Sequence, residues 1–175
     1  PLTSSAASDV YKRQSSDSFE EITYEGYGPK GIAVIIECLT DNKNRTVSEV
    51  RHALTKYNGS LGTKGSVAHL FKKIGILTLL DTSEDDLINY IDEIEILDYE
   101  QIDNNCVVNT EPASLFKVKS FFEEKSLQTK DEEIILEPTT MCDIDETDIE
   151  QVELFTENLE ELDDVQNIYT NINIL

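Results

Sequence analysis

The sequence predicts an α+β protein built from two small α/β sandwich domains, and the last helix and strand fit a return that completes the first of them, which would make it discontinuous. Two kinds of apolar spacing lead to this class, because some runs alternate with period 2 and others recur at helical spacing. The runs follow one another in the order β-α-β, then α-β-β-α-β, then α-β. Hydrophobic residues make up 39% of the 175 residues, which is enough to build a core.

A strand and a helix open the predicted first domain. Alternating apolar residues over 31–39 indicate a strand, and a polar turn follows at residues 41–45. The sequence TVSE at residues 46–49 has the spacing of a capping box, so a helix is expected to begin at Thr46 and to end at Gly59. Its apolar stripe is expected to comprise Val47, Val50, Leu54 and Tyr57.

The middle of the chain predicts a second set of short elements. Residues 65–80 are expected to form one or two strands around a turn at residues 73–75. Ser83 to Asp86 (SEDD) is typical of the start of a short helix. Two further strands are expected at residues 94–99 and 106–109, joined through the polar stretch Asp103-Asn-Asn105.

Two helices and two strands are expected in the rest of the chain. Pro112 suits a helix start, and a strand at residues 133–136 should end at Pro138. A second capping box at residues 147–150 (TDIE) predicts the last helix, and residues 165–174 predict a closing strand. The helix after Pro112 should bury Leu115, Val118 and Phe122. The last helix should bury Ile149, Val152, Phe155, Leu159 and Leu162.

Charge is distributed unevenly along the chain. The formal net charge is −22, which opposes binding to nucleic acid as a whole, because phosphate contacts depend on Lys and Arg. Between Asp41 and Gly75, however, only Asp41 and Glu49 oppose seven basic residues. These are Lys43, Arg45, Arg51, Lys56, Lys64, Lys72 and Lys73. From Asp131 onward there is no Lys, Arg or His, so a locally basic region contrasts with a strongly acidic one.

No motif in the sequence predicts catalysis, a metal or a nucleotide cofactor. Residues 26–31 match G-x-G-x-x-G, but a strand and not a helix is expected after them, so a tight turn is the better interpretation. The glycine-rich stretch 59–66 lacks the Walker spacing and is expected to be a flexible loop. His52, His69 and the three dispersed cysteines have no metal-ligand spacing, and the cysteines suit a reducing compartment.

The region around the first predicted helix is the best candidate for a binding surface. A strand followed by a turn should place residues 42–45 on an exposed loop, beside free N–H groups of the helix start that suit an anionic partner. The two nearby tyrosines are expected to stack on bases, although packing in the core is the alternative. The predicted surface comprises Tyr24, Tyr27, Asn42, Lys43, Asn44, Arg45, Arg51 and His52. An ordinary solvated helix face is the other interpretation of its charge.

Several segments together resemble the YebC/PmpR family. They are Tyr24–Gly31 (YEGYGPKG), Ile36–Thr46 (IECLTDNKNRT), Glu49–Ala53 (EVRHA), Gly62–Ser66 and Asp164–Tyr169 (DVQNIY). The resemblance runs from about Phe19 to Ile174. Members of this family are described as probable transcriptional regulators, and the family includes the mitochondrial translational activator of cytochrome c oxidase subunit I. The chain departs from the family at Lys30, where Gly is usual, and at Thr170, where His is frequent.

The resemblance implies a three-domain protein of which this chain carries two. A basic helical first domain is expected to be missing, domain 2 to comprise residues 18–80 plus 145–175, and domain 3 to comprise residues 81–144. The only Met is Met141, so the chain is expected to be N-terminally incomplete. Residues 1–17 are left out of the fold prediction, because Ser4 to Gln14 resembles a translated cloning or sequencing adapter; a natural disordered tail is the alternative.

The resemblance also implies a regulator of gene expression without catalytic activity or cofactor. The first hypothesis is a translation factor that contacts ribosomal or messenger RNA or the ribosome, and the second is a DNA-binding transcriptional regulator. An enzyme lacks a chemical constellation here, and a protein–protein adaptor is allowed by the acidic C-terminal region. No membrane and no small-molecule substrate is expected. The expected location is the cytoplasm, or the mitochondrial matrix if the source is a eukaryote.

Overall fold

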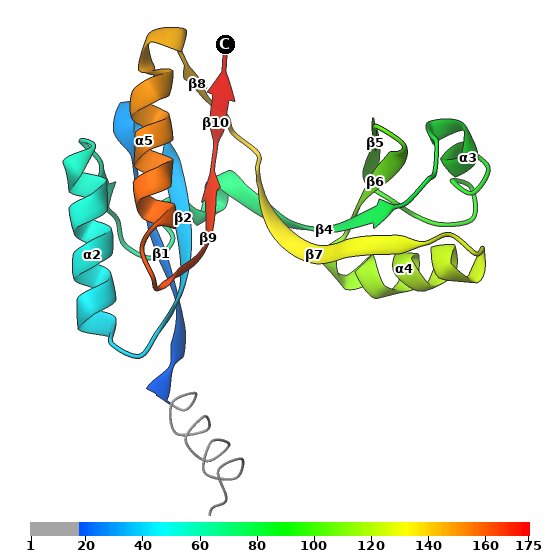
Figure 1. Ribbon diagram of the computed structural model, residues 1–175, viewed down its shortest axis with the longest axis horizontal. Coiled ribbons are helices and arrows are strands. Elements are labelled where there is room, and N and C mark those ends of the chain that lie inside the picture. Colours follow the sequence, from blue (N-terminus) through cyan, green and yellow to red (C-terminus); the bar gives the residue numbers. More distant parts are fainter. Residues whose placement is uncertain (1–17) are drawn as a thin grey trace, which may run out of the picture. The chain divides into compact units, whose positions relative to one another are not determined.

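The computed structural model describes residues 18–175, so the adapter-like head at residues 1–17 lies outside the described part. The chain divides into two compact units (Figure 1). Unit 1 runs to Phe71 and resumes at Pro138, and unit 2 is Lys72–Glu137. These junctions lie before those expected at residues 80 and 144, because the strand that begins at Phe71 continues without a break into the sheet of unit 2.

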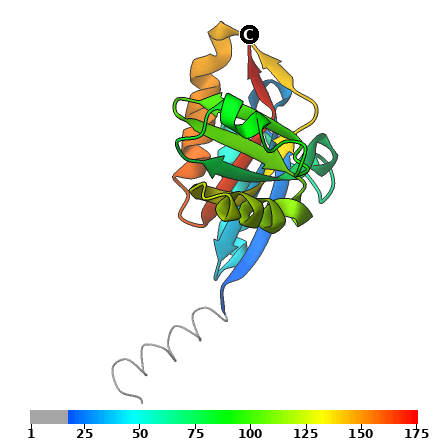
Figure 2. The same ribbon diagram turned by 90° about the vertical axis from the view of Figure 1, so that its right-hand side faces the viewer.

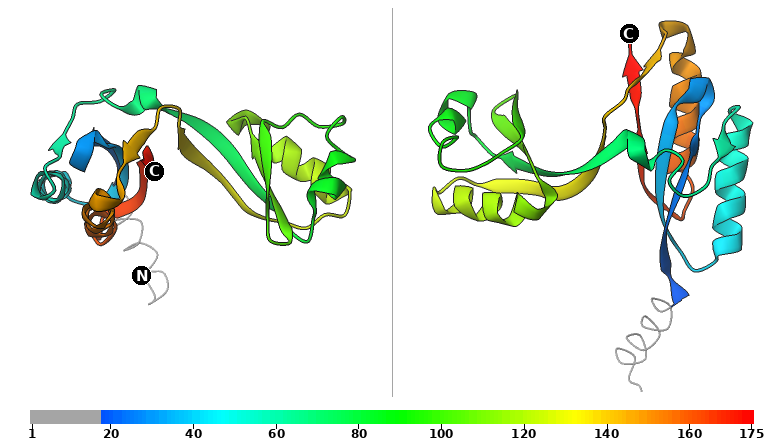
Figure 3. Two further views of the ribbon diagram at one scale, coloured as in Figure 1. Left: turned by 90° about the horizontal axis from the view of Figure 1, so that it is seen from above. Right: turned by 180° about the vertical axis from the view of Figure 1, so that it is seen from behind.

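Unit 1 contains a four-stranded antiparallel sheet in the order β3-β1-β2-β9. Its strands are β1 (Glu20–Tyr27), β2 (Ala33–Thr40), β3 (Ser60–Leu61) and β9 (Val165–Thr170). Helices α2 (Lys43–Lys56) and α5 (Ile149–Glu160) lie side by side on one face of the sheet (Figures 1 and 3). A separate parallel pair joins β8 (Cys142–Ile144) to β10 (Ile172–Ile174). Short 3₁₀ turns are η1 (Pro29–Gly31), η2 (Ala68–Leu70) and η4 (Glu146–Asp148).

Both helices of unit 1 bury apolar side chains against the same face of β2. The shared core comprises Val34, Ile36 and Cys38 from β2, Val50, Ala53 and Leu54 from α2, and Phe155 and Leu159 from α5. The ring of Phe155 meets Tyr57 edge-on, with ring centroids 6.0 Å apart. The predicted helical stripes are therefore largely confirmed, with Thr46 and Ala53 joining the buried side of α2.

Unit 2 packs two helices on a sheet in the order β5-β6-β4-β7 (Figure 2). Its elements are β4 (Phe71–Leu79), α3 (Glu84–Ile88), β5 (Asp98–Ile102), β6 (Asn105–Thr110), η3 (Pro112–Ser114), α4 (Leu115–Glu124) and β7 (Thr129–Pro138). The expected stripe of α4 is fully buried, and Leu77, Leu79, Cys106 and Val108 complete the core. Helix α3 begins after Ser83, as the sequence predicted, and Ser83 caps it by exchanging hydrogen bonds with Asp86.

Strand β1 is an element that the sequence reasoning missed. Its eight residues alternate polar and apolar side chains, but three glutamates among them hide the strand signal. Its pairing with β2 runs from Glu20 opposite Thr40 to Tyr27 opposite Ala33. The turn that follows uses Lys30 and Gly31 at positive φ, 62° and 80°, which explains a glycine-rich connection into β2.

Both helix starts in unit 1 differ from the prediction. Helix α2 begins at Lys43, because Asn42 and not Thr46 caps it: the Asn42 side chain accepts the Arg45 amide N–H at 3.1 Å. The TVSE sequence therefore lies inside the helix. At α5 the expected capping box at residues 147–150 does not form, because η4 supplies the first turn and the N-cap Asp148 makes no side-chain cap.

Three predicted strands also change. No turn interrupts β4 at residues 73–75, and β5 lies at Asp98–Ile102 and not at residues 94–99. The expected closing strand 165–174 is two strands in different sheets, divided at the buried Asn171. The Asn171 side chain accepts from the Ala33 amide at 2.9 Å and donates to the Thr140 carbonyl at 3.0 Å, which fixes this crossing point.

Candidate nucleic-acid interface

The start of α2 is organised by a hydrogen-bond network and not by an open loop. The amide N–H of Asn42 donates to the Thr40 hydroxyl oxygen at 2.9 Å, and the Thr46 hydroxyl contacts the same oxygen at 2.6 Å. Thr40 and Thr46 are both buried. Residues 43–45 are therefore the first helical turn, which corrects the exposed loop expected at residues 42–45.

Arg45 is committed to an ion pair inside this network. Its Nη2 lies 2.9 Å from Asp164 Oδ1 and 2.8 Å from Asp41 Oδ1, and its Nε donates to Asp164 Oδ2 at 3.2 Å. Burial alone would raise the pKa of Asp164, but hydrogen bonds from Arg45 and Thr46 outweigh it and hold that pKa below its usual value. The Arg45 guanidinium thus already pairs with the buried Asp164, and the role of Arg45 in binding an external anion stays a prediction.

The solvent side of α2 carries the remaining basic groups. We call this surface the α2 face: Lys43, Asn44, Ser48, Arg51, His52, Thr55 and Lys56, all exposed. Lys43 pairs with Glu20 at 2.9 Å, and the Lys56 ammonium lies 5.6 Å from the Tyr57 ring centroid. Among residues 18–175, Arg51 makes no ion pair. The only carboxylate in α2 is that of Glu49, so the α2 face has positive charge available for an anion.

The two predicted tyrosines do not share a surface. They lie three residues apart in β1, so they point to opposite faces of the sheet. Tyr24 is half-buried against the core of unit 1, and burial raises its pKa. Tyr27 is 37% exposed, and its hydroxyl donates to the Ser66 carbonyl at 3.4 Å. Of the eight predicted residues, the structure gathers Lys43, Asn44, Arg51 and His52 on the α2 face, with Asn42 as its cap.

The glycine-rich stretch after β3 is organised around Glu25, a residue that sequence reasoning did not single out. The buried Glu25 carboxylate accepts backbone N–H groups of Gly65 at 2.7 Å, Val67 at 3.1 Å and Ala68 at 2.7 Å. Burial raises the pKa of Glu25, but these N–H donors outweigh it and bring the pKa below its usual value. The loop amides that would suit a phosphate are thus already occupied by a carboxylate.

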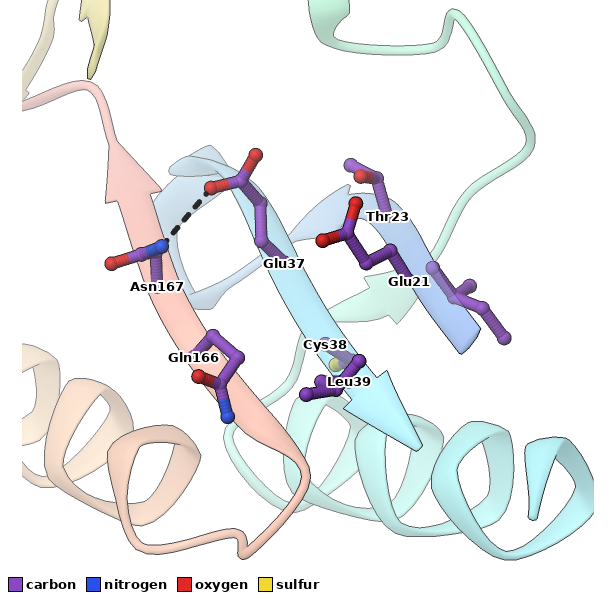
Figure 4. A pocket seen from close by; sticks show the side chains of 8 residues that line it. Glu21, Thr23, Glu37, Cys38, Leu39, Gln166 and Asn167 are labelled. Atoms are coloured by element: carbon purple, nitrogen blue, oxygen red, sulfur yellow. Dashed lines mark hydrogen bonds between the residues drawn. The ribbon is translucent and has the colours of Figure 1, made fainter. Parts of the chain in front are cut away.

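The open face of the sheet in unit 1 has a shallow cavity of about 260 Å³, shown in Figure 4. Its lining includes Glu21, Thr23, Glu37, Leu39 and Asn167, on the side of β1 and β2 away from the helices. The Asn167 amide donates to Glu37 at 3.3 Å. Glu21 and Glu37 are the acidic side chains of this lining, which includes no histidine and no basic group.

Other functional classes would call for a metal cluster, a reactive thiol or a membrane-spanning helix within residues 18–175. No three His, Cys, Asp or Glu side chains there come together as a metal site. Burial and Asp164 raise the pKa of the Cys38 thiol to about 11, which keeps it protonated at neutral pH. No helix in this part of the chain is both long enough and apolar enough to span a membrane.

The fold and the site define a two-unit α+β protein whose distinctive surface is a basic helix face. The family described as "TACO1/YebC second and third domain" matches residues 19–172, and the chain belongs to this family. A "Probable transcriptional regulatory protein" from Nitratiruptor is 44% identical over 155 residues, covering 88% of this chain and 65% of that protein. A protein of the same name from Coxiella burnetii is 43% identical over 157 residues, and the match covers 89% of this chain and 64% of that protein.

A crystal structure supports the same assignment at the level of the fold. A conserved hypothetical protein from Aquifex aeolicus superposes with a TM-score of 0.78 at 36% sequence identity. The match covers 90% of this chain and 66% of that one. The chain thus spans slightly less than two thirds of the length of these relatives.

Proposed function

We propose that this chain is part of a non-enzymatic regulator of gene expression, acting as a ribosome- or RNA-associated translation factor through the α2 face. One observation carries the proposal. In a chain of net charge −22, the exposed side of α2 combines Lys43, Arg51 and Lys56 with neutral hydrogen-bonding groups and only one carboxylate. Nucleic-acid backbones are bound by this combination of cations and short polar side chains.

The rest of the chain favours a partner that is not naked duplex. The acidic surfaces repel an extended polyanion, so binding is expected only where a structured partner meets the α2 face alone. A folded RNA or a ribosomal subunit offers such a local contact. We therefore expect this chain to bind duplex DNA weakly at near-physiological salt.

The second candidate is a DNA-binding transcriptional regulator. It is favoured by the names of the Nitratiruptor and Coxiella relatives, "Probable transcriptional regulatory protein". The translation factor and the DNA-binding regulator differ in which nucleic acid should compete for binding to the α2 face. Excess structured RNA should displace a labelled ribosomal RNA fragment from the chain under the first proposal, and excess duplex DNA should do so under the second.

The test removes positive charge from the α2 face without touching Arg45. The variant Lys43→Ala/Arg51→Ala/Lys56→Ala should lower association with ribosomal subunits or structured RNA at least tenfold, about 1.4 kcal/mol. The fold should survive, because all three side chains are exposed. Association is measured by cosedimentation and by fluorescence anisotropy, and folding by circular dichroism.

A matched control separates local contact from net charge. Lys72→Ala/Lys73→Ala/Lys117→Ala removes three exposed lysines of unit 2 and changes the net charge equally. We expect less than a twofold effect from it. Equal losses from both variants, or no loss from the first while it stays folded, would refute the α2 face as the binding surface.

A further inference from the structure

The outer edge of β1 is paired along only part of its length. Strand β3 pairs with Gly26 and Tyr27, and the Gly62 amide donates to the Glu25 carbonyl at 2.8 Å. Beyond Gly62 the chain turns away, because its following amides bind the Glu25 carboxylate. The edge from Glu20 to Thr23 therefore has no neighbouring strand among the described residues.

The unpaired edge presents backbone groups in a strand arrangement. In an antiparallel pair, the N–H and C=O groups of alternate residues point to the partner and to the opposite side. Because the Glu25 carbonyl points toward β3, the backbone groups of Thr23 and Glu21 point the same way, away from β2. They therefore lie outside the β1–β2 ladder, and the other backbone hydrogen bonds of residues 18–175 do not include these four N–H and C=O groups.

A groove runs along this edge. Its volume is about 550 Å³, and six successive residues of β1, from Glu20 to Glu25, line it together with Lys43, Gly62 and Lys64. A lining by consecutive residues means that the groove follows the strand and not one face of the sheet. It is therefore long enough for a short extended segment placed beside β1.

We propose that this edge binds an extended segment of a partner protein as an added strand, with basic side chains opposite Thr23 and Glu21. The inference goes beyond the proposed function, because it concerns a protein ligand along the β1 edge, whose groove shares only Lys43 with the α2 face. Free N–H and C=O groups in strand geometry are complementary to another polypeptide backbone. Neither a small molecule nor a nucleic acid repeats that pattern of donors and acceptors.

Charge on the open face favours basic side chains in the segment; of the two lysines that line the groove, Lys43 is already paired with Glu20. Glu21, Thr23 and Glu37 project together on the side away from the helices (Figure 4), and Thr23 lies directly opposite Glu37 in the sheet. Within residues 18–175 neither glutamate has an ion-pair partner. Lys or Arg at two alternate positions of the added strand would reach both carboxylates, and an apolar residue between them would cover Ile22 on the other face.

A second copy of the chain fits this edge poorly. Antiparallel pairing of two β1 edges centred on Thr23 would set Glu21 of one copy opposite Glu25 of the other. Parallel pairing would set Glu21 beside Glu21. Both arrangements bring like charges together across the ladder, which opposes self-association.

The experiment uses the 175-residue chain and an acetylated, amidated peptide of sequence TVKVKVT, in which lysines alternate with valine. Binding is followed by titration and by amide hydrogen exchange. The peptide should slow exchange of the Glu21 and Thr23 amides at least tenfold at saturation. The isomeric peptide KTVVVTK has the same charge without the alternation, and should bind at least tenfold more weakly.

Two charge-reversal variants complete the test. Glu21→Lys should weaken TVKVKVT at least tenfold, whereas Glu153→Lys on the exposed side of α5 makes the same charge change and should alter affinity less than twofold. Equal effects of the two variants, equal binding of the two peptides, or unchanged amide exchange would each overturn the proposal. So would dimers of the chain that protect the same amides without peptide.

Discussion

The two helices of unit 1 pack on one face of the same sheet, yet they present opposite charges to solvent. Helix α2 contains four basic residues and one glutamate, whereas α5 contains four glutamates and no basic residue. Their buried sides are alike, because each supplies large apolar groups to the core of β2. The buried apolar sides thus determine where both helices lie. The charges on their exposed sides determine what each helix can bind.

A second contrast lies within α2 itself. Arg45 and Arg51 are both exposed arginines of one helix, but Arg45 pairs with Asp164 whereas Arg51 makes no ion pair within residues 18–175. Arg45 links the start of α2 to Asp164, which lies between α5 and β9. Arg51 is available for an external anion. A count of basic residues cannot separate these roles; the position of the acidic partner, far away in sequence, decides between them.

The shared core gives the largest expected effect. Phe155 is fully buried and contacts Tyr57, the residue that follows α2. Its ring also packs so closely on Gly28 that a Cβ added there would lie only 2.5 Å away. Phe155→Ala should lower the free energy of unfolding by about 3–5 kcal/mol, because it leaves a cavity between both helices and the sheet. Urea unfolding measures this. Leu154→Ala, at an exposed neighbouring position, should cost far less, and similar losses would contradict a common core.

The Arg45–Asp164 contact should matter next. Asp164→Ala should lower the free energy of unfolding by about 1–3 kcal/mol, because it removes the acceptor of the Arg45 and Thr46 hydrogen bonds in a buried position. Asp163→Ala removes the same charge from an exposed neighbour and serves as the control. If the two variants unfold at the same urea concentration, the network does not hold α2 in place.

The sequence predicted the apolar elements well and the polar ones poorly. The stripes of α4 and α5 were predictable, since burial imposes a helical period that can be read locally. Strand β1 was missed because a glutamate occupies a buried position in it, and Glu25 is stabilised by amides about forty residues later. The start of α2 was misplaced because both Asn42 and Thr46 suit a cap, and the tertiary partner Asp164 draws Thr46 inside the helix.

The candidate site was predictable only in part, for the same reason. Locally clustered charge located the α2 region, and Lys43, Asn44, Arg51 and His52 do lie on its exposed side. Sequence proximity could not show that Tyr24 packs partly against the core or that Arg45 pairs with Asp164. The role of these four residues in binding stays a prediction.

Acid should affect the two anchored carboxylates in the same direction. The pKa values of Glu25 and Asp164 are lowered in the folded protein, so each contributes stability above its unfolded pKa, near 4, and loses it as pH falls through the folded pKa. Glu25→Gln should cost about 1 kcal/mol at neutral pH and should flatten the decline between about pH 5 and pH 2. Urea unfolding across pH measures this, with the exposed Glu20→Gln as control. An unchanged slope for Glu25→Gln would show that the loop amides do not depend on its charge.

The smallest effect should come from the acidic neighbour of the α2 face. If the α2 face binds RNA, the carboxylates of α5 repel the same phosphates from one helix away, at roughly the 10 Å screening length of 0.1 M salt. Glu150→Gln/Glu153→Gln/Glu157→Gln should therefore raise affinity for structured RNA about two- to threefold, or about 0.4–0.7 kcal/mol, at low salt. The gain should disappear in high salt. Glu100→Gln/Glu111→Gln/Glu124→Gln makes the same charge change in unit 2 and should give a smaller gain, because those exposed side chains belong to the unit that does not contain α2. Equal gains from both triple variants would mean that RNA responds to net charge alone, and the contrast between the two helices would then have no bearing on binding.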